Sequence, residues 1–202
     1  MLTPTLRLAN QISSAYDEIS QQCSHLMAFT ESRTDSLTGT SNRRGLDDSL
    51  AAQLALMNRY EVGFSVAIFD IDHFKHVNDE HGHLQGDRVL QKVAKLLEEL
   101  ARETDLVASF GGEEFLVVMP RTDLEGACVF AERVRAVVEI ELSVTVSGGV
   151  AAAMDGDTPD SLLSRADAAL YQAKTNGRNR VCRHDGAFVE PMADVAAVPQ
   201  LA

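Results

Sequence analysis

The chain has 202 residues, of which 45% are hydrophobic and 24% are charged, and its formal net charge at pH 7 is −12. This length and composition fit one folded domain with an appendage, and they exclude a fibrous or wholly disordered protein. The negative charge argues against nucleic acid or an anionic membrane as a partner, because both need a cationic surface. An anionic ligand would therefore need local positive charge.

The apolar runs are shorter than the roughly 20 residues that span a bilayer, and no basic-then-apolar signal segment opens the chain. We therefore expect no membrane span and a cytoplasmic location. Cys23, Cys128 and Cys182 are odd in number and widely spaced, which fits neither a disulfide framework nor a paired-cysteine zinc site. We expect them to be reduced thiols.

Residues 8–29 place mostly apolar side chains at alternating steps of four and three, from Leu8 and Ile12 to Leu26 and Phe29. This heptad-like spacing predicts an amphipathic helix. The helix could pack on its own domain, or it could form a parallel dimer stalk with a second copy of the chain. We assign residues 1–32 to this helix or stalk.

The next part of the chain begins with a loop that leads into a helix carrying Leu46, Leu50 and Leu54 on one face. The run "GFSVAIFDID" then predicts a strand buried on both faces, and two helices follow it within residues 73–103. A glycine pair between "DLVASF" and "FLVVMP" predicts a tight hairpin, because such turns need positive φ.

After the hairpin we predict a helix over 124–139, a strand over 143–152, a helix over 159–176 ended by Gly177, and a short strand near 178–183. Residues 184–202 lack a sustained period, and we expect a disordered tail there. The element order predicts an α+β domain of ferredoxin-like type over residues 33–183, with a central mixed sheet surrounded by helices. In such a sheet the hairpin tip and the end of the first strand could lie side by side.

Four carboxylates mark these two places: Asp70 and Asp72 end the first strand, and Glu113 and Glu114 follow the glycine pair. Carboxylates that converge at the edge of a sheet can bind a hard cation such as Mg²⁺. Alternatively, Asp72 caps the helix that starts at His73, and the glutamates are solvated turn residues. We favour the cap for Asp72 and the metal site for Asp70 and Glu113.

Four histidines, His73, His76, His81 and His83, fall close together in sequence and could bind zinc. Their spacing matches no established zinc pattern, and "DEHGHLQGD" is more typical of a polar loop between helices. We therefore favour the loop.

Five segments, taken together, resemble the GGDEF-domain family of bacterial diguanylate cyclases. They are "DSLTGTSNRR" at 35–44, "DIDHFKHVNDEHGHLQGD" at 70–87, "GGEEF" at 111–115, "VTVSGG" at 144–149 and "ADAALYQAKTNGRNR" at 166–180. The resemblance covers roughly residues 33–183. It implies a palm-type, nucleotide cyclase-like sheet and the condensation of two GTP molecules into cyclic di-3′,5′-GMP with release of pyrophosphate.

The resemblance implies roles for three of these acids, Asp70, Glu113 and Glu114. Asp70, the Ile71 carbonyl and Glu113 correspond to ligands of Mg²⁺ or Mn²⁺, with two ions per active site. Glu114 corresponds to an acid that assists deprotonation of the attacking hydroxyl. Gly111 and Gly112 leave room for the nucleotide in a turn that needs permissive φ.

It also implies how GTP is held. The backbone amides of His73 and Phe74 and the cations Lys75, Lys174 and Arg178 correspond to triphosphate contacts, and Lys75 is also counted among the catalytic residues. Asn78 and Asp87 correspond to guanine readers, because a carboxylate accepts from the guanine N1–H and amino group, which adenine cannot offer. His83 lies between them in sequence and could line the base pocket. The alternative for His83 and for Lys75 is a solvated position in a loop.

Because one protomer would hold one GTP, the resemblance implies catalysis by a homodimer. "RETD", from Arg102 to Asp105, corresponds to the family's inhibitory site for the product, with Arg133 as the second arginine. The alternative for Arg102 and Asp105 is a surface ion pair. The implied partners are thus GTP and cyclic di-GMP.

The sequence departs from the family pattern at three places. Ser109-Phe110 replaces the usual Arg-Tyr, Thr40 replaces a leucine, and Gly149 stands where a β-branched residue is common. The loss of the arginine leaves a second hypothesis open, a catalytically weak or silent module that acts as a receptor for GTP or cyclic di-GMP.

Overall fold

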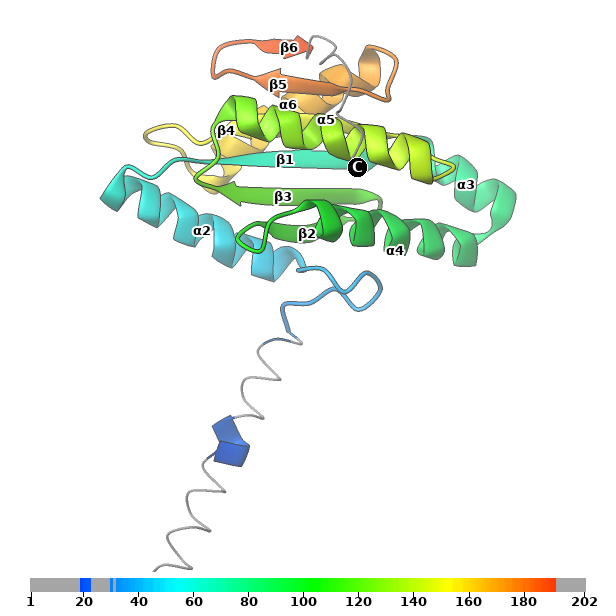
Figure 1. The fold of residues 1–202 in the computed structure, drawn as a ribbon, viewed down its shortest axis with the longest axis horizontal. Helices are drawn as coiled ribbons and strands as arrows, with labels where there is room; N and C mark the ends of the chain where they lie inside the picture. Colours follow the sequence, from blue (N-terminus) through cyan, green and yellow to red (C-terminus); the bar gives the residue numbers. More distant parts are fainter. Residues whose placement is uncertain (1–18, 23–29, 31, 192–202) are drawn as a thin grey trace, which may run out of the picture. The chain divides into compact units, whose positions relative to one another are not determined.

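The computed structural model describes residues 19–22, 30 and 32–191, and the chain divides into two units, residues 1–34 and 35–202 (Figure 1). In the first unit, residues 19–22 and 30 are helical, and the rest of the predicted seam over residues 8–29 lies outside the described residues. The stalk assignment therefore stays a prediction.

The second unit is built on a mixed six-stranded sheet with the order β2-β3-β1-β4-β5-β6. Its strands are β1 (Phe64–Ile71), β2 (Leu106–Gly111), β3 (Glu114–Pro120), β4 (Val146–Ala152), β5 (Val181–His184) and β6 (Val189–Pro191). All neighbouring pairs are antiparallel except β4 and β5. The predicted α+β class and mixed sheet are confirmed.

Helices cover both faces of this sheet, as Figure 1 shows. They are α2 (Arg43–Tyr60), α3 (Phe74–His81), α4 (His83–Leu100), α5 (Leu124–Glu141) and α6 (Pro159–Thr175). Three of them have a side-chain cap at the N-terminus, because Asn42, Asp123 and Thr158 each accept a backbone N–H of the first turn. None of the helices in the described part of the chain is both long and apolar enough to cross a membrane.

Strand β1 is buried along its whole length, and its side chains alternate between two hydrophobic clusters. Ala67, Phe69 and Ile71 pack with α4 and α5 in one cluster. Val66 and Ile68 pack with α2 and α6 in the other. Because successive side chains alternate, Asp70 continues the series that faces α2 and α6.

The expected disordered tail does not begin at residue 184, because residues 184–191 continue the sheet. His184 ends β5, and Asp185 closes a turn by accepting the N–H groups of Ala187 (2.8 Å) and Phe188 (2.7 Å). Val189 then pairs with His184 and packs on Ala169, Ala173 and Cys182. The Asp-Gly pair at 185–186 was the sequence signal for this hairpin.

Candidate active site

The acidic end of β1 lies against the acidic tip of the β2–β3 hairpin. Asp70 is directly opposite Glu114 in the antiparallel pairing of β1 with β3. One residue further on, the N–H of Ile71 donates to the carbonyl oxygen of Glu113 at 3.3 Å. The two strand ends that the sequence marks as acidic are therefore neighbours.

The hairpin turn exposes its glycines to open space. Gly111 and Glu114 pair across the ladder, so the connecting residues are Gly112 and Glu113 rather than the two glycines. Gly112 has φ +56°, a left-handed conformation that favours glycine. A Cβ built on Gly111 or Gly112 would meet no atom within 4 Å, which leaves room beside the carboxylates for a ligand.

A lysine from α6 meets the buried carboxylate at the end of β1. Asp70 Oδ2 lies 2.7 Å from Lys174 Nζ, and the Asp70 side chain is only 10% exposed. Burial raises the pKa of Asp70, Lys174 opposes that shift, and the charges of Glu113 and Asp72 add to it. The pKa of Glu114 is raised as well, first by burial and then by the charge of Asp70.

These mutually repelling oxygen donors fit a hard divalent cation. Mg²⁺ prefers carboxylate and carbonyl oxygens and usually completes its shell with water and substrate phosphates. Among the described residues, no three His, Cys, Asp or Glu side chains form a metal-binding group on their own. An ion held by Asp70 and Glu113 would therefore need the Ile71 carbonyl and ligand oxygens as well.

Asp72 does not cap the following helix, which corrects the sequence prediction. Helix α3 begins after His73, which has φ +59°, and no side chain caps it. The Asp72 carboxylate turns inward, where it is 4% exposed and accepts from the hydroxyls of Thr145 and Ser147, each at 2.7 Å. Both of its carboxylate oxygens therefore accept hydrogen bonds from the interior of the domain.

The remaining predicted phosphate ligands surround the same end of the sheet. Lys174 lies in the last turn of α6, and Arg178 follows in the loop that leads to β5. His73, Phe74 and Lys75 form the start of α3, directly after β1, and no capping side chain covers its first N–H groups. The structure therefore gathers cations from two separate segments.

The predicted guanine readers lie on adjacent helices. Asn78 is on α3 and Asp87 is in the first turns of α4, where the exposed His83 is the first residue. Gly86 allows this approach, because a Cβ on it would lie 1.9 Å from Asn78 Oδ1. Sequence reasoning missed Gly86, although a glycine inside an amphipathic helix was a signal for close packing.

The structure brings Arg102, Asp105 and Arg133 to one cavity. This cavity of about 80 Å³ is also lined by Met119, Thr122, Gly126, Val129 and Phe130. Asp105 accepts the backbone N–H of Arg102 at 2.9 Å, so the two residues form a local turn instead of a side-chain ion pair. Arg133 donates to the Leu100 carbonyl at 2.9 Å.

The residues that depart from the family pattern have different surroundings in the structure. Arg43 of α2 lies over the ring of Phe110 at 4.3 Å, so a cation from another element contacts the residue that follows Ser109. Thr40 is 1% exposed, and its hydroxyl is 2.9 Å from that of Thr38.

Gly149 could not be replaced by the β-branched residue that is common at this place in the family pattern. A Cβ on it would lie 2.2 Å from the Ala166 carbonyl and 2.3 Å from the Leu170 nitrogen, both in the backbone of α6. At Gly148 the nearest atoms are side-chain atoms of Val181 and Phe69, at 3.2 Å or more. The backbone contact of α6 with β4 therefore requires glycine at position 149.

Comparison with known proteins agrees with this geometry. The family model described as "Diguanylate cyclase, GGDEF domain" matches residues 32–180. The diguanylate cyclase DgcP of Pseudomonas aeruginosa is 41% identical over 156 residues, which cover 73% of this chain and 23% of DgcP. The diguanylate cyclase VdcA of Vibrio cholerae is 38% identical over 186 residues, which cover 86% of this chain and 54% of VdcA.

A solved structure is similar over most of the same region. It contains the coiled coil and GGDEF domain of DgcB from Caulobacter crescentus in complex with cyclic di-GMP, with a TM-score of 0.80 and 32% identity. The match covers 87% of this chain and 98% of that one. The chain spans 23% of the length of DgcP and 54% of the length of VdcA. Because the family model matches most of this chain, the chain belongs to the GGDEF domain family of diguanylate cyclases.

Proposed function

We propose that this chain is a diguanylate cyclase that condenses two GTP molecules into cyclic di-3′,5′-GMP and releases two pyrophosphates. The observation that carries the proposal is the register of β1 with β3, which places Asp70 opposite Glu114 beside the open glycine turn. The polar residues of the family motifs surround this point on α3, α4 and α6.

Asp70, the Ile71 carbonyl and Glu113 would hold Mg²⁺ or Mn²⁺, two ions per site, together with phosphate oxygens. Bound ions would neutralise phosphate charge and polarise the phosphorus for an in-line displacement. Lys174 and Arg178 bind the triphosphate, and Lys75 and the backbone amides of His73 and Phe74 receive its oxygens at the start of α3.

The guanine base lies between α3 and α4, where Asn78 and Asp87 read its edge and His83 lines the pocket. In each of two equivalent steps, a 3′-oxygen bonds to the α-phosphorus of the other GTP. The bond from that phosphorus to the β-phosphate bridge breaks, and pyrophosphate leaves with the bonding electrons. Glu114, opposite Asp70, accepts the proton of the attacking hydroxyl.

Two such sites must face each other, because each chain supplies one acidic strand end for one GTP. We therefore propose a homodimer as the active form, with residues 8–29 as the candidate stalk. The enzyme would act in the cytoplasm, where GTP is available.

The cavity lined by Arg102, Asp105 and Arg133 supports a second role for cyclic di-GMP, as an inhibitor of the enzyme. Two arginines and a carboxylate offer donors for phosphate and an acceptor for guanine N–H groups. The cavity lies beside α5, at the ends of β2 and β3 that are opposite to the hairpin turn.

The deciding experiment is incubation of the full chain with GTP and Mg²⁺, followed by chromatography of the products. We expect cyclic di-GMP and pyrophosphate in a one-to-two ratio, and we expect Glu113→Gln to form neither. Binding of cyclic di-GMP without any pyrophosphate release by the wild type would instead support the receptor hypothesis and overturn the proposed reaction.

A further inference from the structure

Asp72 has no part in the proposed chemistry, yet the fold builds a buried site around it. Its carboxylate is 4% exposed and receives three hydrogen bonds. Oδ1 accepts from Ser147 at 2.7 Å, and Oδ2 accepts from Thr145 at 2.7 Å and from the backbone N–H of Asn179 at 3.0 Å. Burying a carboxylate costs free energy unless it is fully hydrogen-bonded. The three donors around Asp72 therefore indicate a structural role for its carboxylate.

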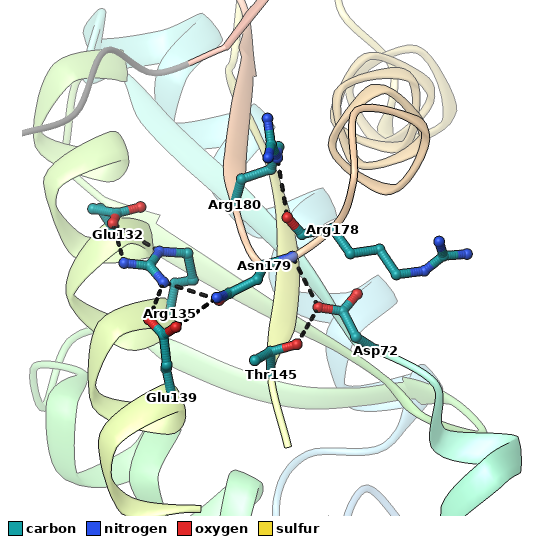
Figure 2. Close-up of polar contacts among 8 residues, drawn as sticks. All are labelled: Asp72, Glu132, Arg135, Glu139, Thr145, Arg178, Asn179 and Arg180. Atoms are coloured by element: carbon teal, nitrogen blue, oxygen red, sulfur yellow. Dashed lines mark hydrogen bonds and ion pairs between the residues drawn. The ribbon is translucent and has the colours of Figure 1, made fainter. Parts of the chain in front are cut away.

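The third donor connects Asp72 to the loop that carries a predicted triphosphate ligand. Asn179 follows Arg178 directly, and both have left-handed backbones, with φ +46° and +62°. Such conformations are unfavourable for residues other than glycine, particularly for arginine, and persist when surrounding contacts fix them. The hydrogen bond from Asn179 to Asp72 is one of these contacts (Figure 2).

Helix α5 holds the side chain of the same asparagine. Asn179 donates to Glu139 at 2.7 Å and accepts from Arg135 at 2.9 Å, and Arg135 also pairs with Glu139 at 2.6 Å. The hydrogen bonds from Arg135 and Asn179 lower the pKa of Glu139, and hydrogen bonds to Glu132 and then Glu139 raise the pKa of Arg135. Asn179 is thus fixed from two sides, through its backbone by Asp72 and through its amide by α5.

Arg178 is fixed through its backbone, while its side chain stays available. Its N–H donates to the Ala173 carbonyl at 3.1 Å, and its own carbonyl accepts from Arg180 Nε at 3.0 Å. Figure 2 shows the guanidinium extending away from the Asn179 cluster. Within the described part of the chain this guanidinium has no ion pair, and the residue is exposed.

We propose that Asp72 is a positioning residue that fixes the 176–180 loop so that Arg178 meets the triphosphate. The two aspartates at the end of β1 and just after it then have separate roles, because Asp70 pairs with Lys174 at 2.7 Å and Asp72 accepts from Asn179 at 3.0 Å. The loop is tied to the strand end that carries the metal ligands. This inference rests on the proposed function, because it concerns how the same nucleotide is held.

The test measures binding of 3′-deoxy-GTP, which lacks the attacking hydroxyl and cannot react, and compares it with binding of 3′-deoxy-GMP. Asp72→Ala should weaken binding of the triphosphate at least tenfold and binding of the monophosphate less than twofold, because the loop acts on the outer phosphates. In an Arg178→Ala background, Asp72→Ala should cost less than a further twofold, since both changes remove the same interaction. Asp72→Asn should restore binding to within about threefold, because its amide oxygen can still accept from Asn179.

A matched pair of hydroxyl variants keeps the test decisive if Asp72→Ala does not fold. Thr145→Val removes the hydroxyl that shares Oδ2 with Asn179, and Ser147→Ala removes the one on Oδ1. We expect a two- to fivefold loss of triphosphate affinity in the first and less than twofold in the second. Equal losses in this pair, unchanged binding by a folded Asp72→Ala, or additive losses with Arg178→Ala would each overturn the inference. A wild-type protein that binds no 3′-deoxy-GTP would instead overturn the proposed function itself.

Discussion

The two faces of the sheet are apolar over most of their length and differ at one end. On the face covered by α4 and α5, β1 remains apolar through Phe69 and Ile71, and the chain continues into the buried Phe74. On the face covered by α2 and α6, the same strand changes from Ile68 to Asp70, and β3 contributes Glu114 beside it. β1 therefore makes apolar contacts on the α4/α5 face up to its end, whereas on the α2/α6 face charged side chains replace apolar ones where a nucleotide would bind.

This difference predicts that stability and chemistry respond to different substitutions. Changes on the α4/α5 face should lower the free energy of unfolding. Changes at the acidic end of the α2/α6 face should lower turnover and leave the fold intact.

Phe69→Ala should produce the largest effect. Phe69 is 1% exposed and packs edge-on against Phe130 of α5, with ring centroids 6.4 Å apart. Removing a buried aromatic ring costs about 3–5 kcal/mol of unfolding free energy, measurable by urea denaturation. Phe188→Ala, at a residue 70% exposed, is the control and should cost less than about 0.5 kcal/mol. Equal losses in the two variants would contradict the assignment of the core.

Glu114→Gln should separate activity from stability on the other face. Because burial raises the pKa of Glu114 in the folded state, its charged form is less favourable there than in the unfolded chain, and neutralising it should maintain or increase the free energy of unfolding. Loss of a proton acceptor should lower turnover by about a hundredfold, followed as pyrophosphate release. The exposed Glu98→Gln is the control, with turnover expected at the wild-type level. Normal turnover in Glu114→Gln would remove this residue from the mechanism.

Gly86→Ala should act on substrate choice at the α3–α4 junction. The added methyl would lie 1.9 Å from Asn78 Oδ1 and would displace that side chain from the place where we expect guanine. We expect about a tenfold loss in the preference for GTP over ATP in kcat/KM, which corresponds to about 1.4 kcal/mol. Gly63→Ala, where a Cβ meets nothing within 4 Å, should change nothing. An unchanged GTP preference in Gly86→Ala would show that Asn78 does not read the base.

Arg102→Ala should give the smallest change and tests the cavity on the α4/α5 side. The side chain is exposed and its backbone N–H keeps its bond to Asp105, so unfolding should be unaffected. Half-inhibition of turnover should need about fivefold more cyclic di-GMP, a change of about 1 kcal/mol in product binding. The exposed Arg88→Ala on α4 is the matched control. Inhibition that stays at the wild-type level in Arg102→Ala would exclude the cavity as the product site.

The sequence predicted those parts of the site that are marked by local patterns in elements close together in the chain. The pairing of Asp70 with the hairpin acids could be expected, because a strand ending in acid and a glycine turn are both local patterns. The Asp72 network could not, since its donors are two hydroxyls on a distant strand segment and a backbone N–H 107 residues away in a left-handed loop. A backbone donor has no signature in side-chain type. Asp72 therefore looked like a helix cap, which is the common local role of such a residue.

The direct backbone contact at Gly149 could couple substitutions far from the nucleotide site to the position of α6. Because no side chain separates α6 from β4 there, the height of the helix above the sheet is set by direct contact of main chains. Lys174 lies about one turn beyond Leu170 on that helix. Any larger residue at 149 would act as a wedge that lifts Lys174 from Asp70, so a buried position with no polar atom of its own in the site would control the separation of its charges.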